Sequence, residues 1–253
     1  MSKYFYRVPN KWIREKPPDI KRICTYYLIN LVRGISDYGM ISIKFLIDNC
    51  GYKYRRGKDG INNTYINIIK QAAIQQDIIL DENYNNVNYI NVDAAIPYIV
   101  NSINFDEVDN FTKLTEQEFD TIIKNNPSRN REGILAVYLY IKSYHHPYTP
   151  VNRPIGFYQN LASIRKSLDI SERVLIKLLN WLVDQKLLIK HYTGSITTDN
   201  PNKPRKNVPN IYIPNLGQSQ EEINETIKST EKAMKDYYGV DEFLPFMQNL
   251  KEE

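Results

Sequence analysis

Residues 157–213 place the strongest constraint on what this chain can fold into. Ser171 stands before a stretch whose apolar side chains recur at helical spacing, so it can cap an amphipathic helix. A shorter amphipathic stretch ends near Leu168, and only a short turn separates the two. Two apolar runs, residues 187–189 and 211–213, follow with a basic loop between them. The pattern predicts a helix-turn-helix followed by a hairpin, which is the arrangement of a winged helix.

The helix predicted after Ser171 separates apolar from polar side chains. With the apolar side chains on one face, Arg173, Lys177 and Asn180 gather on the opposite face. Arg and Lys can donate hydrogen bonds to guanine or to phosphates, and Asn can bond adenine with both ends of its amide. An ordinary solvated helix face is the alternative. The frame around the helix favours contact with the major groove of DNA, joined by Ser171 and Glu172 at the start of the helix.

The loop between the two predicted strands carries a second basic cluster. Lys203, Arg205 and Lys206 stand close together in it, among several prolines. A basic wing can follow phosphates, or insert an arginine into the narrow minor groove that AT-rich DNA favours. The prolines also suit a solvated loop, which is the alternative interpretation. We predict a wing over residues 193–207 that lies along a minor groove.

The first part of the chain follows the same order of elements. After Pro17-Pro18, helical spacing predicts a helix over residues 20–32, and residues 39–42 read as a short strand. Two further helices are predicted over residues 43–49 and 61–76. Residues 77–80 and 87–92, separated by an Asn-rich turn, read as a hairpin. The two parts of the chain are therefore predicted to be tandem domains of one fold type.

The predicted N-terminal domain has its own candidate DNA contacts. Four cations precede its third helix and are well placed for phosphates: Lys53, Arg55, Arg56 and Lys58. The exposed face of that helix is rich in amides, which suits adenine readout: Asn63, Thr64, Asn67, Lys70 and Gln71. A solvated face is an equally weighted alternative, because Asn is abundant throughout the chain.

Charge divides the chain into alternating blocks. Residues 1–100 hold 14 basic and 9 acidic side chains, and residues 127–217 hold 13 and 5. The block between them, residues 101–126, holds 2 basic and 6 acidic side chains, and residues 218–253 hold 4 and 9. Two basic blocks separated and followed by acidic ones suit two nucleic-acid-binding modules and a tail.

These patterns define the predicted domains and the fold class, mostly α with small β-wings. An N-terminal winged-helix domain covers residues 1–103 and closes with a helix over residues 93–103. An acidic linker covers residues 104–114. A C-terminal winged-helix domain covers residues 115–217 and opens with the capping-box pattern Thr-Glu-Gln-Glu.

A second capping box, residues 219–222, predicts a helix in the acidic tail over residues 218–253. The helix carries an apolar stripe at heptad-like spacing: Ile223, Ile227, Thr230, Met234 and Tyr237. Two heptads are too few for a convincing coiled coil. Packing against the C-terminal domain is therefore preferred over formation of a homodimer.

Composition excludes several classes of protein. No apolar run approaches the length that spans a bilayer, and the first residues show no signal-peptide core. Cys24 and Cys50 have no metal-type spacing and are expected to be reduced thiols of a cytoplasmic protein. His145 and His146 have no third ligand nearby, and no glycine-rich phosphate loop is present. We therefore expect no enzyme activity, no cofactor and no metal.

Two stretches show a resemblance to a known family. The first, residues 4–13, reads YFYRVPNKWI. The second, residues 161–189, contains LASI at 161–164, LDIS at 168–171 and LLNWLVDQKLLI at 178–189. They resemble winged-helix replication proteins of Gram-positive phages and plasmids, a group that includes plasmid initiators and the N-terminal domains of DnaD-like primosome proteins. The resemblance implies binding to a replication origin, often at repeats, and recruitment of host replication proteins. The chain lacks an evident second, all-helical module of the DnaD-like kind, which puts helicase loading in doubt.

These observations lead to one functional hypothesis with two alternatives. Two winged helices would bind double-stranded DNA sequence-specifically, at AT-rich repeats, for replication initiation or its control on a plasmid or phage. The acidic tail would contact a host replication protein. A transcriptional regulator of a mobile element shares this chemistry but differs in target. A protein-docking adaptor would use the same fold and barely contact nucleic acid.

Overall fold

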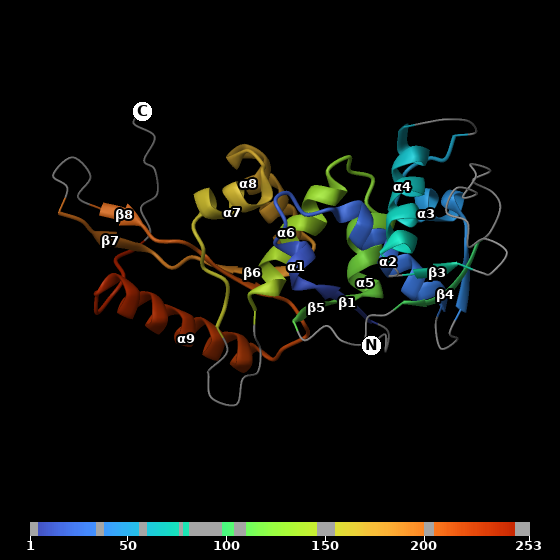
Figure 1. The fold of residues 1–253 in the computed structure, drawn as a ribbon. Helices are drawn as coiled ribbons and strands as arrows, with labels where there is room; N and C mark the ends of the chain where they lie inside the picture. Colours follow the sequence, from blue (N-terminus) through green and yellow to red (C-terminus); the bar gives the residue numbers. More distant parts are fainter. Residues whose placement is uncertain are drawn as a thin grey trace. The chain divides into compact units, whose positions relative to one another are not determined.

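The computed structural model describes residues 5–33, 38–55, 60–75, 78–80, 98–103, 110–145, 155–199 and 205–245 (Figure 1). The chain forms two compact units, residues 1–136 and residues 137–253, which we call the N-terminal and the C-terminal unit. Both combine helices with small antiparallel sheets, so the coarse α+β class is confirmed. The boundary between the units falls within helix α6 (Arg131–Ser143).

The centre of the N-terminal unit is a helix, a strand, two further helices and two further strands. In chain order these are α2 (Ile20–Arg33), β2 (Tyr38–Ile41), α3 (Ile43–Asn49), α4 (Gly60–Ile74), β3 (Ile78–Leu80) and β4 (Tyr98–Ile103). The strands form one antiparallel sheet with β4 between β2 and β3. Ser42 caps α3, because its hydroxyl accepts a hydrogen bond from the backbone N–H of Phe45 at 3.0 Å.

The prediction of a helix over residues 93–103 was wrong for its second half. Residues 98–103 are a strand, and residues 93–97 lie outside the described residues. The expected hairpin strand over residues 87–92 also lies outside them, and β4 is the strand that pairs with β3. A short apolar run is compatible with a helix or a strand. Residues 98–103 are a strand because they pair with β2 and β3, which are distant in the sequence.

A two-stranded ribbon joins the beginning and the end of the N-terminal unit. Strand β1 (Phe5–Pro9) pairs antiparallel with β5 (Phe111–Thr115). Residues 111–114 were expected in an acidic linker, but they belong to β5. Thr112 and Leu114 are buried, which gives the alternation of side chains that is typical of a strand. Residues 104–109 of that expected linker lie outside the described residues.

The predicted capping box after this ribbon is present, and it lies within the N-terminal unit. The Thr115 hydroxyl accepts from the backbone N–H of Glu118, whose carboxylate accepts from the N–H of Thr115. It opens α5 (Glu116–Phe119), which continues as the π-helix η3 (Asp120–Lys124). The ring of Phe119 stacks on Tyr27 of α2 with 4.0 Å between centroids. This contact secures the short helix to the buried face of α2.

The C-terminal unit follows the same order of elements. After α6 and the isolated bridge at Phe157 come α7 (Leu161–Leu168), α8 (Glu172–Asp184), β6 (Leu188–His191), β7 (Ser195–Thr197), β8 (Arg205–Asn207) and β9 (Ile211–Pro214). Tyr212 of β9 exchanges backbone hydrogen bonds of 2.9 and 2.8 Å with Phe157 and pairs with Lys190 of β6. Strand β9 is therefore central, as β4 is in the N-terminal unit.

Strands β6 to β9 are two ladders of one bent ribbon. The inner ladder joins β6 to β9, from Leu188↔Pro214 to His191↔Ile211, and the outer ladder joins β7 to β8. Residues 192–194 and 208–210 interrupt the pairing between them. Gly194 has a φ of +126°, which L side chains rarely adopt, so glycine is required where the ribbon bends. Figure 1 shows β7 and β8 extending beyond β6 and β9.

Helix α9 (Gln220–Tyr238) packs against this ribbon, so the preferred prediction for the tail is confirmed. The predicted capping box between Ser219 and Glu222 opens it. Met234 is buried beside Val208 and Ile213. The end of the predicted stripe was wrong by one residue, because Tyr237 is 77% exposed while its neighbour Tyr238 packs against the core.

Candidate nucleic-acid interface

Helix α8 has a capped N-terminus, a buried face and an exposed polar face. The Ser171 hydroxyl accepts from the backbone N–H of Val174 at 3.4 Å, which starts the helix where the sequence predicts it. Leucines bury the inner face: Leu175, Leu178, Leu179 and Leu182. The polar residues predicted to contact DNA share the outer face, and each is exposed: Ser171, Glu172, Arg173, Lys177 and Asn180.

Helices α7 and α8 expose three further residues that were not predicted from the sequence. Ile176 is 40% exposed and lies one turn from Arg173 and Asn180. An exposed apolar side chain on a reading face suits the methyl group of thymine. Arg165 and Lys166 are exposed on α7, the helix before α8. Their position in the short helix predicted before Ser171 was the sequence feature that could have identified them.

The cations of this surface are available for an anionic partner. In the part of the chain that the structure describes, no ion pair joins Arg165, Lys166, Arg173 or Lys177 to a carboxylate. Four cations on two adjacent helices, α7 and α8, are therefore not held in ion pairs with any described residue, and the exposed carboxylates of Asp169 and Glu172 lie in the same segment. Charge of this kind dominates the binding of nucleic-acid backbones.

The outer part of the bent ribbon carries the predicted basic wing. Arg205 and Lys206 of β8 are exposed, whereas Lys203 lies outside the described residues. At the bend, Tyr192 is 59% exposed, and the Lys190 ammonium lies 4.4 Å from its ring centroid. This cation and aromatic pair was not predicted, although the two residues are two positions apart and such residues share one face of an extended chain.

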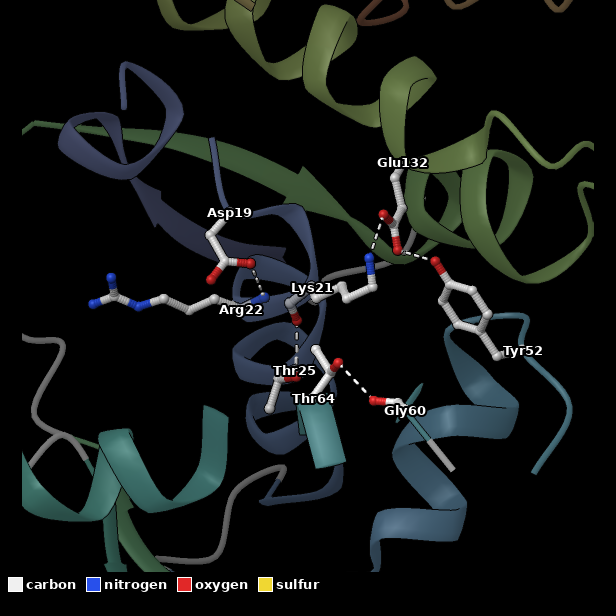
Figure 2. A network of polar contacts seen from close by, with 8 residues as sticks. All are labelled: Asp19, Lys21, Arg22, Thr25, Tyr52, Gly60, Thr64 and Glu132. Atoms are coloured by element: carbon white, nitrogen blue, oxygen red, sulfur yellow. Dashed lines mark hydrogen bonds and ion pairs between the residues drawn. The ribbon is translucent and has the colours of Figure 1, made fainter. Parts of the chain in front are cut away.

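The amide-rich face predicted for the N-terminal unit lies on α4. Asn63, Asn67 and Gln71 are exposed, whereas Thr64 and Lys70 are half-buried. The Thr64 hydroxyl donates to the backbone carbonyl of Gly60 at 2.9 Å, within its own helix (Figure 2). Three of the five predicted residues are thus exposed to solvent.

This face borders a pocket of about 400 Å³ between α2 and α4. Thr64, Asn67 and Gln71 line one wall, and Arg22 and Tyr26 of α2 line the other. The Arg22 guanidinium lies 4.1 Å from the ring centroid of Trp12. The sequence analysis did not single out Arg22, because its proximity to α4 is a tertiary contact.

The basic segment before α4 is positioned by a polar network. Glu132 accepts hydrogen bonds from the ammonium of Lys21, at 2.7 Å, and from the hydroxyl of Tyr52 (Figure 2). Burial, followed by this hydrogen bond, raises the pKa of the Tyr52 hydroxyl. Gly51 has a φ of +74°, and a Cβ there would lie 2.6 Å from the guanidinium of Arg131. The positive φ favours glycine at residue 51, and a side chain there would displace the flexible guanidinium of Arg131.

The network leads into the predicted phosphate contacts. Lys53 and Arg55 are exposed, whereas Arg56 and Lys58 lie outside the described residues. The backbone carbonyl of Arg55 accepts a hydrogen bond from the side-chain amide of Asn62 at 2.9 Å. Asn62 is buried in α4, so this bond ties the basic segment to the helix.

The described residues hold no cluster of three or more His, Cys, Asp and Glu side chains that could bind a metal ion. His145 is buried, and its Nδ1 lies 3.3 Å from the backbone carbonyl oxygen of Ile155. Cys24 and Cys50 are free and buried. A hydrogen bond between them, followed by burial, raises the pKa of the Cys24 thiol. No described helix combines the length and apolar character needed to cross a membrane.

Comparison of the chain with protein-family models and with curated proteins finds no match.

Proposed function

We propose that each unit is a winged helix and that the protein binds double-stranded DNA. The order helix, strand, helix, helix, strand, strand, with the last strand central in the sheet, supports the fold assignment in both units. In this assignment α8 and α4 are the recognition helices that enter major grooves. The bent ribbon over residues 188–214 is the wing of the C-terminal unit.

One observation carries this proposal. Arg173, Ile176, Lys177 and Asn180 share one exposed face of a capped helix that follows a short helix and precedes a basic ribbon. The face combines donors for guanine or phosphate, an apolar contact for thymine and an amide for adenine. Such a mixture fits a helix that reads base edges.

The amide face of α4 supports a second, less charged contact by the N-terminal unit. Asn67 and Gln71 can each bond adenine with both ends of the amide, and AT-rich DNA offers that base frequently. Arg22 lines the same pocket as Asn67 and Gln71, and its guanidinium lies 3.9 Å from the carboxylate of Glu15. Lys53 and Arg55 are exposed in the segment before α4. Two reading units in one chain fit a bipartite or repeated AT-rich site.

The role we infer is initiation of replication, or its control, on a plasmid or phage. It rests on the two DNA contacts proposed above and on the exposed side of α9, where acidic residues such as Glu221 and Glu225 would be available to a host replication protein. A transcriptional regulator would use the same surfaces. Sites that overlap promoters, with no effect of the protein on copy number of the replicon, would favour regulation.

The deciding experiment measures duplex binding by charge-reversed variants. Arg173→Glu with Lys177→Glu should reduce affinity at about 0.1 M salt by at least about 100-fold and lower the slope of log K against log salt by about 2. Lys228→Glu with Lys232→Glu is the matched control, because these residues are also exposed and one turn apart, on α9. Fluorescence anisotropy on duplexes selected from random sequence gives both quantities.

Three outcomes distinguish the alternatives. Selection of a repeated AT-rich site, bound by the control and lost by the α8 variant, supports the proposal. Equal losses in both variants mean that binding follows net charge and not α8. A failure to select any sequence contradicts the proposal and favours a protein-docking adaptor, in which Ile176 would contact a protein.

A further inference from the structure

The chain returns from α9 to the bend of the ribbon and pairs with it (Figure 1). The backbone N–H of Ser195 donates to the carbonyl of Leu244 at 2.9 Å, and the N–H of Leu244 donates to the carbonyl of Ser195 at 2.8 Å. The Ser195 hydroxyl donates to the carbonyl of Pro245 at 3.0 Å. Residues 243–245, which we call the strap, therefore lie along the edge of β7 that β8 leaves open.

The strap meets the ribbon where the ribbon bends. A Cβ at Gly194 would lie 2.3 Å from the carbonyl oxygen of Leu244, so the backbones approach as closely as glycine allows. On the other side of the bend, the N–H of Val208 donates to the carbonyl of Gly194 at 3.0 Å. Both edges of the chain at residues 194–195 are thus bonded.

The strap is itself anchored in the core of the C-terminal unit. Phe243 packs against the buried cluster that contains Val208, Ile211 and Met234. Helix α9, which precedes the strap, is fixed through Thr230, whose hydroxyl accepts from the backbone N–H of Gly156 at 2.8 Å. The strap therefore connects the ribbon to the body of the unit.

The outer ladder needs such support. Strands β7 and β8 are each three residues long, and a two-stranded hairpin of this size is at best marginally stable in water. A third backbone segment at its base supplies the missing pairing. Arg205 and Lys206, the described cations of the wing, stand on this ladder.

We infer that the strap fixes the direction of the wing and that Leu244 is a positioning residue for DNA binding. The inference rests on the proposed function, because it assigns the wing to the DNA contact. It also places residues 243–245 of the acidic tail in the DNA-binding apparatus, where they order the outer ladder before DNA binds.

Two variants of Leu244 isolate the strap. Leu244→Pro removes the N–H that donates to Ser195, whereas Leu244→Ala keeps it and is the matched control. Amide hydrogen exchange should show that Ser195 loses about tenfold or more of its protection in the proline variant only. Protection of Leu178 and Leu182 in α8 should be the same in both variants, which confirms that each is folded.

DNA binding is then measured with and without the wing cations. Arg205→Ala with Lys206→Ala should weaken duplex binding about tenfold in the full chain and in the Leu244→Ala background. In the Leu244→Pro background the same change should have almost no effect, because the wing contact is already lost. An equal effect of the wing substitutions in both Leu244 backgrounds overturns the inference.

The exchange measurement separates this inference from the proposed function. A full chain that binds no duplex contradicts the proposed function, and exchange alone then decides whether the strap holds the ribbon. Equal protection of Ser195 in the proline and alanine variants overturns the strap whatever the DNA result.

Discussion

The two units use the same order of elements but present different chemistry on their third helix. Helix α8 exposes Arg173 and Lys177, whereas α4 exposes the amides of Asn63, Asn67 and Gln71. Helical spacing and packing place side chains on these faces in the same way in both units. The order of elements therefore decides where the exposed face of the third helix lies. A few exposed residues decide how strongly that face attracts an anion.

The units also differ in how their basic segments are held. In the N-terminal unit Glu132, Lys21 and Tyr52 position the segment before α4 through side-chain hydrogen bonds. In the C-terminal unit the strap holds the wing through backbone hydrogen bonds to Ser195. A side-chain network can be removed by one substitution, whereas a backbone pairing tolerates most side-chain changes.

Exchanging the two chemistries is the strongest test of this comparison. Arg173→Asn with Lys177→Asn gives α8 an amide face, and it should reduce duplex affinity by about 100-fold at about 0.1 M salt and the salt slope by about 2. The reciprocal change, Asn63→Arg with Asn67→Lys on α4, should increase affinity by about tenfold by adding phosphate contacts. Anisotropy titrations at several salt concentrations measure both effects.

Substitution of Lys228 and Lys232 by Asn controls for the loss of two charges elsewhere on the C-terminal unit. If that control weakens binding as much as the α8 change, the location of the charges does not matter. If the α4 change gains nothing although the variant is folded, α4 does not face DNA.

The sequence was sufficient where local chemistry decides. The Ser171 cap, the capping boxes at Thr115 and Ser219, and the exposed face of α8 all depend on residues within two turns of one another. Spacing along the chain reports such relations directly. The candidate residues on α8 were predicted correctly as exposed for the same reason.

The sequence was insufficient where pairing between distant segments decides. Residues 98–103 form β4 because they pair with β2 and β3. Residues 111–115 form β5 because they pair with β1. The strap pairs with Ser195 across the whole of α9. Period and composition carry no information about these partners, so the missed contacts of Arg22 and Leu244 share one cause.

Alkaline pH should separate the stabilities of the two units. In the N-terminal unit the hydrogen bond with Cys50 is the main cause that raises the pKa of the Cys24 thiol. Burial is the main cause that raises the pKa of the Tyr65 hydroxyl. The folded chain therefore keeps these two protons at pH values where the unfolded chain releases them, above about pH 8.5 for cysteine and about pH 10 for tyrosine. Stability is therefore intact below these values and falls as pH rises, by up to about 1.4 kcal/mol per pH unit for each such group.

The C-terminal unit has raised tyrosine pKa values but contains no cysteine, so it should begin to lose stability only above about pH 10. Its Trp181 and the Trp12 of the N-terminal unit report on each unit separately. Urea unfolding under reducing conditions, with Trp181→Phe and Trp12→Phe variants, measures the difference between pH 8 and 10. Cys24→Ala should abolish the early loss in the N-terminal unit. A loss that persists in this variant would assign it to another group.

The smallest expected effect concerns the beginning of α4 and α8. Helix α8 starts behind the Ser171 cap, whereas α4 starts with Gly60, where an added Cβ would meet no atom within 4 Å. Gly60→Ala should stabilise the N-terminal unit by about 0.5 kcal/mol, because alanine restricts the unfolded chain without strain. Gly239→Ala is the control, since its surroundings are also open but its φ of +65° should make alanine destabilising by about 1 kcal/mol. We expect unchanged duplex affinity for Gly60→Ala in anisotropy titrations. A gain in affinity would show that order at the start of α4, and not only its amide chemistry, separates the two units.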